Sequence, residues 1–487
     1  MKIPDIPSLH IYPDSVVETA DAGYFLARKT DTGEKVVGCV GGDCLDSAQK
    51  VAEVDGKPVC LAPTNHANAA TIRKLLPWNS PSTIGLATSV GLGDRLGLAT
   101  PGHLRAIKDT QLVPFLAQQS IREMTRTRRT PDEVMDAATW GVFQEGRRGR
   151  FGSDADHLQK PEDIDVTVAA GFTMFTIDPG AHVNNDADTL EGSDLASAFG
   201  ALESETLGMT GDELRKLYTA KPFKLDGGGE IAFDDTTLAR AAVKYSRAVA
   251  HTVKMYRHLS TRTSSQFELE VSVDETDSPT SPAEHYFFAA ELRRLGVKWI
   301  SLAPRFLGRF EKGVDYIGDL DEFRKAFAVH AAVMRTLGPY KMSIHSGSDK
   351  FSVYPIIAEL TQGLVHLKTA GTSYLEALRA IATIDPDLFR EILDFARERY
   401  DTDKASYHVS AQVGKVPAAA SLKDDQLPAL LEDFDARQVL HCTFGSVLTA
   451  DDGRKYRPRF YAALESDEEV YYAVLEKHIK RHVNPFV

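Results

Sequence analysis

The sequence predicts an α/β protein built around a (β/α)₈ TIM barrel. From residue 82 onward, eight short strand candidates alternate with helical segments over about 300 residues, and polar side chains lie at nearly every strand end. Alternation of this kind is typical of parallel strands joined by crossover helices. The number of strands favours a closed barrel over a doubly wound sheet.

The eight predicted strands are, in order, STIGLATSVGLGD, LVPFLAQQS, GRFGSDADH, GFTMFTID, QFELEVSVDE, VKWISLAP, KMSIH and LVHLK. Capping residues mark the helices between them. Thr130, Pro131 and Glu133 form a capping box with proline in the first turn, and Ser281 with Glu284 forms another. The last two strands flank FSVYPIIAELTQG, a short helix whose crossover implies a parallel pair.

Three further parts accompany the barrel of residues 81–400. Residues 1–80 are expected to form an N-terminal α/β lead-in, with SAQKVAEV as a helix. Residues from about 183 to 262 form a largely helical insertion after strand four. Residues 401–487 form a mostly helical C-terminal extension packed on the barrel, with one strand-like run, QVLHCTFGSVL.

Composition excludes several classes of protein. A net charge of -13 without a long basic run argues against nucleic-acid binding. No apolar run approaches the ~20 residues of a membrane span, so we expect no membrane partner and a cytoplasmic location. Four cysteines are too few for a disulfide framework, and Cys39 and Cys44 are interpreted as ordinary thiols rather than a metal or redox pair.

Polar residues at the predicted strand ends are the candidates for a site, because barrel active sites lie at the carboxyl ends of the strands. They are Asp94 and Arg95 for strand one, Gln118 and Ser120 for strand two, Asp154 and Asp156 for strand three, Asp178 for strand four, Arg305 for strand six, His345 for strand seven, and His366 and Lys368 for strand eight. Strand five alternates Glu268, Glu270, Ser272 and Asp274 with apolar residues. A buried acidic face needs a partner for its charge, and a divalent cation is one.

Glu270, His345 and His366 are the predicted metal ligands, since imidazole and carboxylate suit Zn²⁺, Mn²⁺, Co²⁺ or Ni²⁺. The alternative is that both histidines are core residues with ordinary hydrogen bonds. His157 is expected to point away from Asp156 and either to support a metal ligand from behind or to be structural, while His441 is a further candidate ligand.

Asp156 and Lys368 are the predicted catalytic residues, with Asp156 as the acid/base; alternatively, Asp154 and Asp156 form salt bridges with barrel lysines. The predicted substrate-binding residues are Asp94, Arg95, Gln118, Ser120, Asp154, Arg305, Ser346 and Lys350. Ser346 and Lys350 lie in SGSDK, which suits an anionic group or, alternatively, a helix-capping turn.

Eight ordered blocks resemble the metal-dependent tagaturonate epimerase family: VGLGDRLGLATPGH, FLAQQSIREM, WGVFQEG, GSDADHL, GFTMFTID, ELEVSVDET, IHSGSDKFSVYP and HLKTAGTSYLEAL. The resemblance covers roughly residues 80–380 and extends more weakly through the tail. It implies a metal-dependent 4-epimerase of D-tagaturonate and D-fructuronate, or of the related D-tagatose and D-fructose. Lys350 and Arg305 would then pair with the C6 carboxylate.

The chemistry of such a substrate favours a retro-aldol route. The C4 proton of a 2-ketose is not α to the carbonyl, and oxidation at C4 would need a nicotinamide, for which no correctly placed GxGxxG is found. The metal would hold the C2 and C3 oxygens while Asp156 moves the C4 hydroxyl proton. Alternatives are a class II aldolase, an aldose–ketose isomerase, or an inactive sugar-binding protein. The expected partner is a small sugar or sugar acid, and a homo-oligomer is possible.

Overall fold

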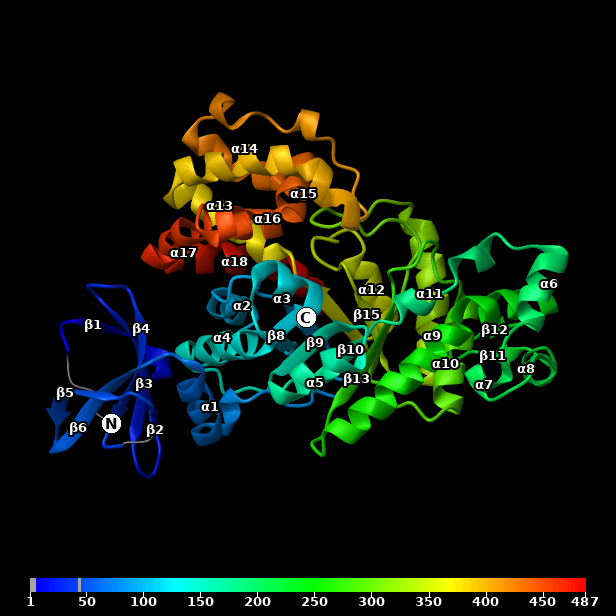
Figure 1. The fold of residues 1–487 in the computed structure, drawn as a ribbon, viewed down its shortest axis with the longest axis horizontal. Coiled ribbons are helices and arrows are strands. Elements are labelled where there is room, and N and C mark those ends of the chain that lie inside the picture. Colours follow the sequence, from blue (N-terminus) through cyan, green and yellow to red (C-terminus); the bar gives the residue numbers. More distant parts are fainter. Residues whose placement is uncertain (1–5, 43–44) are drawn as a thin grey trace.

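Eight parallel strands close into a barrel in the computed structural model, which describes residues 6–42 and 45–487 (Figure 1). The strands follow one another around the barrel in chain order, and β16 closes it by pairing with β7. They are β7 (Ser89–Leu92), β8 (Val113–Ser120), β9 (Gly152–Leu158), β10 (Met174–Ile177), β13 (Glu268–Val273), β14 (Ser301–Pro304), β15 (Lys341–Ile344) and β16 (Val365–Thr369). The predicted TIM barrel is confirmed.

Helices surround the barrel and begin where the capping residues indicate. Both predicted capping boxes, at Thr130 and Ser281, are formed. The helices are α2 (Thr100–Ala106), α3 (Ile121–Thr127), α4 (Pro131–Gln144), α5 (Pro161–Ala169), α9 (Asp235–Arg262), α10 (Pro282–Arg294), α11 (Leu320–Leu337), α12 (Tyr354–Thr361) and α13 (Thr372–Ile384). The apolar faces of these helices, apart from α13, pack with apolar side chains of the strands in one large hydrophobic core.

The N-terminal part is an antiparallel sheet followed by α1 (His66–Leu75). Its strands are β1 (Leu9–Ile11), β2 (Val17–Glu18), β3 (Gly23–Lys29), β4 (Lys35–Val40), β5 (Gln49–Val54) and β6 (Lys57–Pro63). The predicted helix SAQKVAEV is wrong, because β5 occupies most of it. Asp55 and Gly56 both have positive φ and make the tight turn that pairs β5 with β6. Cys44 lies outside the described residues.

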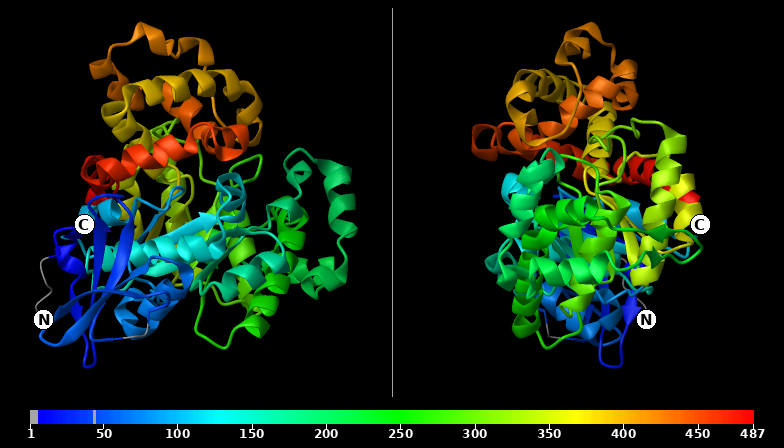
Figure 2. Two further views of the ribbon diagram at one scale, coloured as in Figure 1. Left: turned by 60° about the vertical axis from the view of Figure 1, so that its left-hand side comes forward. Right: turned by 90° about the vertical axis from the view of Figure 1, so that its right-hand side faces the viewer.

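The insertion between β10 and β13 is largely helical and projects from one side of the barrel (Figure 2). It contains α6 (Gly192–Gly200), α7 (Ser204–Leu207), α8 (Gly211–Tyr218), the hairpin of β11 (Phe223–Lys224) and β12 (Glu230–Ile231), and α9. Three consecutive glycines, residues 227–229, have positive φ and form the turn of this hairpin.

The C-terminal part is helical and covers one end of the barrel (Figure 1). Its helices are α14 (Pro386–Asp403), α15 (Phe434–Cys442), α16 (Phe444–Thr449), α17 (Arg457–Ser466) and α18 (Glu468–Val483). The strand predicted for QVLHCTFGSVL is wrong, because this apolar run forms α15 and α16 and is buried in a second core shared with α13. The domain boundary at residue 400 stays a prediction, and α14 runs through it. Across the described ranges, no helix combines the length and apolarity needed to cross a membrane.

Candidate active site

A polar pocket opens at the carboxyl ends of the barrel strands. Side chains from six barrel strands or the loops after them (β7, β8, β9, β14, β15 and β16) line it together with side chains from the C-terminal part. Those that carry the argument below are Arg95, Asp156, His157, His345, Lys368 and His441. The position agrees with the general rule for TIM barrels.

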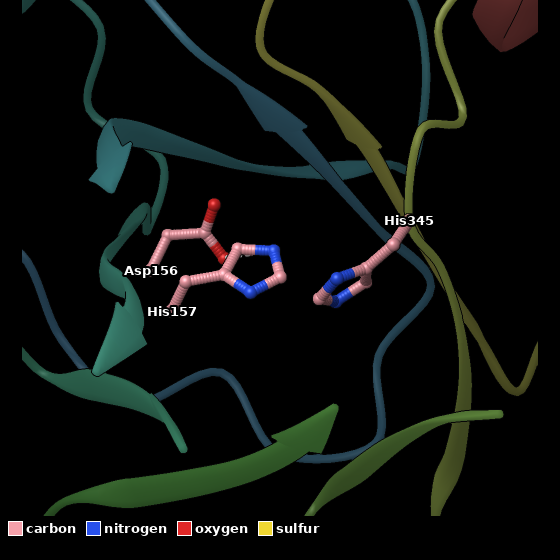
Figure 3. A group of neighbouring side chains, drawn as sticks. All are labelled: Asp156, His157 and His345. Atoms are coloured by element: carbon pink, nitrogen blue, oxygen red, sulfur yellow. Dashed lines mark ion pairs between the residues drawn. The ribbon is translucent and has the colours of Figure 1, made fainter. Parts of the chain in front are cut away.

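Asp156, His157 and His345 come together in this pocket. Each offers one ligand atom, and the three atoms lie within 4.8 Å of one another. Figure 3 shows the rings of His157 in β9 and of His345, just after β15, pointing toward each other, and their centroids are 5.0 Å apart. One carboxylate and two imidazoles are a donor set that suits a divalent transition metal.

His157 reaches the pocket because β9 is irregular. Its φ is +52°, and the pairing of β9 with β10 shifts register at this point. Strict alternation would send Asp156 and His157 to opposite faces, but the bulge turns both consecutive side chains inward. The prediction that His157 points away from Asp156 is therefore wrong.

Lys368 lies at the centre of a buried acidic cluster. Its Nζ is 2.6 Å from Asp156 Oδ1, 2.7 Å from Asp154 Oδ2 and 2.7 Å from Glu270 Oε1. Burial favours a neutral amine, but these carboxylates outweigh it and raise the pKa of Lys368 well above its usual value. Asp154 and Asp156 therefore both form salt bridges with a barrel lysine, as the alternative prediction has it.

Carboxylates also hold His345 in place. Its Nε2 is 2.6 Å from Glu270 Oε1, and its Nδ1 is 3.3 Å from Asp274 Oδ1. Burial opposes protonation, but Asp274 and Glu270 raise the pKa of His345 to about 9. The ammonium of Lys368 faces the carboxylates of Asp154, Asp156 and Glu270, which carry more negative charge than it neutralises. A further positive charge is therefore favoured in this part of the pocket.

His366 lies deeper in the barrel than predicted. It is in register with Ser343, two residues before His345, and it does not line the pocket. Its Nδ1 is 2.9 Å from Ser89 Oγ, which also accepts a hydrogen bond from Lys341. Within the described chain, the ligand groups do not include the predicted set of Glu270, His345 and His366. The group whose geometry could hold a metal ion in this pocket is Asp156, His157 and His345.

Four of the predicted substrate-binding residues line the pocket, and four do not. Arg95, Gln118, Ser120 and Ser346 are in its wall, while Asp94, Asp154, Arg305 and Lys350 are not. Asp94 accepts the backbone N–H groups of Leu96, Gly97 and Ala99 and thereby shapes a loop. Arg305 lines an adjoining cavity that shares Lys312, His345 and other residues with the pocket.

Lys350 is hydrogen-bonded to backbone carbonyl groups and does not face the pocket. Its fully buried Nζ donates to the carbonyl oxygens of Glu311, Val314 and Ser348 at 2.7, 2.5 and 2.9 Å. Burial lowers the pKa of Lys350 to about 7. With its three donors used, Lys350 holds the loop after β15 and has no donor left for a carboxylate.

Comparison with known proteins identifies the family. A model of the tagaturonate epimerase family matches residues 12–486. The chain belongs to this family. A tagaturonate/fructuronate epimerase of Thermotoga maritima is 43% identical over 476 residues, which cover 97% of this chain and 96% of the relative.

Solved structures of a tagaturonate epimerase agree with the fold. The fructuronate-tagaturonate epimerase of Cohnella laeviribosi, in its native crystal and in a glycerol complex, superposes with a TM-score of 0.92 at 36% identity. The match covers 98% of this chain and 96% of that protein. The chain is accordingly an isomerase of the carbohydrate epimerase type.

The C-terminal part of this epimerase supplies pocket residues that the sequence did not identify. Tyr407 comes from the segment after α14, and His441, which was considered only as a second metal ligand, comes from α15. His441 belongs to neither ligand group of the described chain and lies beside Arg95. No spacing relates these residues to the barrel strands, so only the three-dimensional structure brings them to the site.

A second cluster of possible ligands, Asp349 with His478 and His482, is a structural network. The carboxylate of Asp349 is 2.6 Å from His478 Nε2 and 2.8 Å from Arg437 Nη2. His482 Nε2 accepts the backbone N–H of Asp349 at 2.9 Å. Because Arg437 already neutralises the carboxylate, this network ties the loop after β15 to α15 and α18.

Proposed function

We propose that this epimerase interconverts D-tagaturonate and D-fructuronate by inverting C4. Two relatives named for these substrates support the proposal, at 43% and 36% identity over nearly the whole chain. The observation that carries it is the pocket, where Asp156, His157, His345 and Lys368 lie in the same wall as Arg95. Such a pocket suits a small polyol with a carboxylate.

A divalent cation is part of the proposal. The residues fit it, because the three ligand atoms of Asp156, His157 and His345 converge beside an excess of carboxylates. Zn²⁺, Mn²⁺, Co²⁺ and Ni²⁺ all accept this mixture of oxygen and nitrogen donors. When bound, the cation would supply Lewis acidity toward the carbonyl and hydroxyl oxygens of the sugar.

Asp156 and Lys368 handle the proton in the proposed retro-aldol route. Asp156 has two oxygens, so one can ligate while the other, which accepts from Lys368, takes the C4 hydroxyl proton. The C3–C4 bond breaks, and its electrons move onto C3 and the C2 oxygen. The fragments are the enediolate of dihydroxyacetone and tartronate semialdehyde. Rotation of the aldehyde, re-formation of the bond and return of the proton complete the inversion without any co-reactant.

Product analysis tests the function. Purified enzyme supplied with Mn²⁺ or Zn²⁺ and D-fructuronate is expected to form D-tagaturonate, and the reverse, as followed by NMR. Free three-carbon fragments would instead indicate a class II aldolase, and an aldose would indicate an aldose–ketose isomerase. D-Tagatose and D-fructose are proposed as weaker substrates at the same carbon.

Metal removal tests the cation. Chelation and dialysis are expected to reduce the rate at least 100-fold, and stoichiometric Zn²⁺, Mn²⁺, Co²⁺ or Ni²⁺ is expected to restore it. Elemental analysis of the dialysed protein is the control. Full activity of a preparation shown to be metal-free would end this part of the proposal.

Isotope labelling tests the route. Retro-aldol cleavage never breaks the C4–H bond, so substrate deuterated at C4 should epimerise with the label retained and only a small isotope effect. Hydride transfer or deprotonation at C4 would give a large primary effect, and deprotonation would exchange the label with water. Either result would replace the retro-aldol route and leave the epimerase assignment intact.

A further inference from the structure

We propose that Arg95, with His441 and Lys312, forms the subsite that binds the carboxylate of the sugar acid. The inference rests on the proposed function, since it assigns a place to one group of that substrate. The three side chains line the same pocket as the Asp156–His157–His345 trio but come from other elements: the loop after β7, α15 and the loop after β14.

Arg95 is a buried cation with one nitrogen left over. Only 4% of the residue is exposed, its Nε donates to Glu123 Oε1 at 2.8 Å, and its guanidinium lies 3.8 Å from the ring centre of Phe444. Its Nη1 is buried and has no hydrogen-bond partner among the residues that the structure describes. A buried donor without an acceptor costs free energy, which a ligand oxygen would recover.

His441 presents a second donor of the same kind. We assign the ring proton of His441 to Nδ1, because Arg95 can only donate and its Nη2 lies 3.5 Å from His441 Nε2. Nδ1 is buried, and nothing in residues 6–42 or 45–487 accepts its proton. Burial, with Arg95 and Lys312 nearby, lowers the pKa of His441 well below its usual value, so the ring is a neutral donor.

Lys312 adds a third donor and a second positive charge. Its Nζ donates to Ser346 Oγ at 2.7 Å, which leaves further ammonium protons for a ligand. A pocket wall that offers two cations and a neutral N–H selects an acceptor with negative charge. An ionised carboxylate is charged and can accept from all three donors, whereas the C6 hydroxyl of a neutral ketose is uncharged and has only two lone pairs.

The position is held rigid by its surroundings. Gly371 packs so closely against His441 that an added Cβ would lie 2.0 Å from the imidazole Cε1. Glu123, which fixes Arg95, also closes the capping box that begins α3. The donors are therefore arranged before the substrate arrives, which reduces the entropy lost on binding.

Substitution of Arg95 is the test. Arg95→Met is expected to raise the Kd of D-fructuronate by roughly 10- to 100-fold, measured by calorimetry, and its KM in parallel. Inhibition by D-fructose, which lacks the carboxylate, should change by less than about threefold, because it makes no charge-assisted contact. Arg95→Lys should lie between wild type and Arg95→Met. The matched control is Arg309→Met, an arginine that is 58% exposed in the adjoining cavity and should change neither constant.

A double variant separates loss of the subsite from loss of the fold. Arg95→Met leaves Glu123 buried without its partner, so Arg95→Met/Glu123→Gln is measured as well, with circular dichroism and the Tm as checks. Unchanged Kd for D-fructuronate in the folded double variant, or an equal loss for D-fructose, would overturn the subsite. Arg95-dependent binding of D-fructuronate by a wild-type enzyme that does not epimerise it would refute the proposed function and leave the subsite standing.

Discussion

The positions of two barrel histidines, His157 and His366, are the reverse of those predicted from the sequence. His366 was a predicted ligand, yet its Nδ1 is paired with Ser89 below the pocket. His157 was expected to be structural, yet it faces His345 across the pocket (Figure 3). The bulge in β9 explains the position of His157, and the register of β16 with β15 explains that of His366.

His157→Asn is expected to lower bound Zn²⁺ at least tenfold after loading and desalting, because one of three ligands is lost. His366→Gln, a buried barrel histidine below the pocket, is the control and should keep near-stoichiometric metal. Mass spectrometry of metal content per folded protein is the measurement. Retention of metal by His157→Asn together with its loss from His366→Gln would restore the original ligand set.

Residue roles could be predicted from sequence only where alternation holds. Asp156 and Lys368 follow regular strand positions, and both lie in the pocket as expected. His157 breaks the alternation through a positive φ, which no residue type at this position signals. Lys350 follows a strand as predicted. Its ammonium group, however, donates to backbone carbonyl oxygens, and these contacts cannot be predicted from the sequence.

The loop between β15 and α12 shows how elements far apart in the chain build the site. It carries Ser346 into the pocket, and Ser346 and Asp349 both have positive φ. The network of Asp349 with Arg437, His478 and His482 fixes this backbone from α15 and α18. The helices that hold the loop are therefore part of the catalytic architecture.

Asp349→Asn is expected to destabilise the protein by about 3 kcal/mol, because a buried ion pair loses its charge, and to lower kcat at least tenfold. Thermal unfolding and kinetics with D-fructuronate are the measurements. Asp315→Asn is the control, since the exposed Asp315 accepts hydrogen bonds from Ser352 in the same loop. Wild-type kcat in a folded Asp349→Asn variant would show that the network serves stability alone.

Helices and strands could be predicted from the sequence where the apolar pattern and the capping or turn residues indicate the same structure. All eight predicted barrel strands are present, and the helices at Thr130 and Ser281 begin at capping boxes. The Asp55–Gly56 turn signalled a hairpin that the helical interpretation of the preceding residues overlooked. The run QVLHCTFGSVL is buried in a helical core, and a short apolar run of this kind does not distinguish helix from strand.

At the scale of the whole molecule, buried neutral histidines make the free energy of unfolding decrease as the pH falls. Burial, only partly opposed by Asp94, lowers the pKa of His103 to about 4. Burial lowers the pKa of His330 to about 4 as well. The unfolded chain binds these protons near pH 6.5 and the folded chain does not, so stability falls as the pH drops from about 6.5 to 4.

His103→Leu is expected to remove one such contribution, roughly 3 kcal/mol at pH 4, and to lower the pH midpoint of acid unfolding. Neither ring nitrogen of His103 has a partner in the described part of the chain, so little is lost at neutral pH. Circular dichroism against pH is the measurement, with His10→Gln at an exposed position as the control. An unchanged or higher midpoint for His103→Leu would contradict this account.

The seam between β7 and β16 also has a consequence for biosynthesis. Ser89 and His366, which meet there, are 277 residues apart, so β7 leaves the ribosome long before its neighbour exists. At about 5–20 residues per second, one edge of β7 stays open for roughly 15 to 55 s. Open strand edges pair with other chains. Nascent chains arrested before residue 365 should therefore recruit chaperones, and chains that have passed β16 should release them.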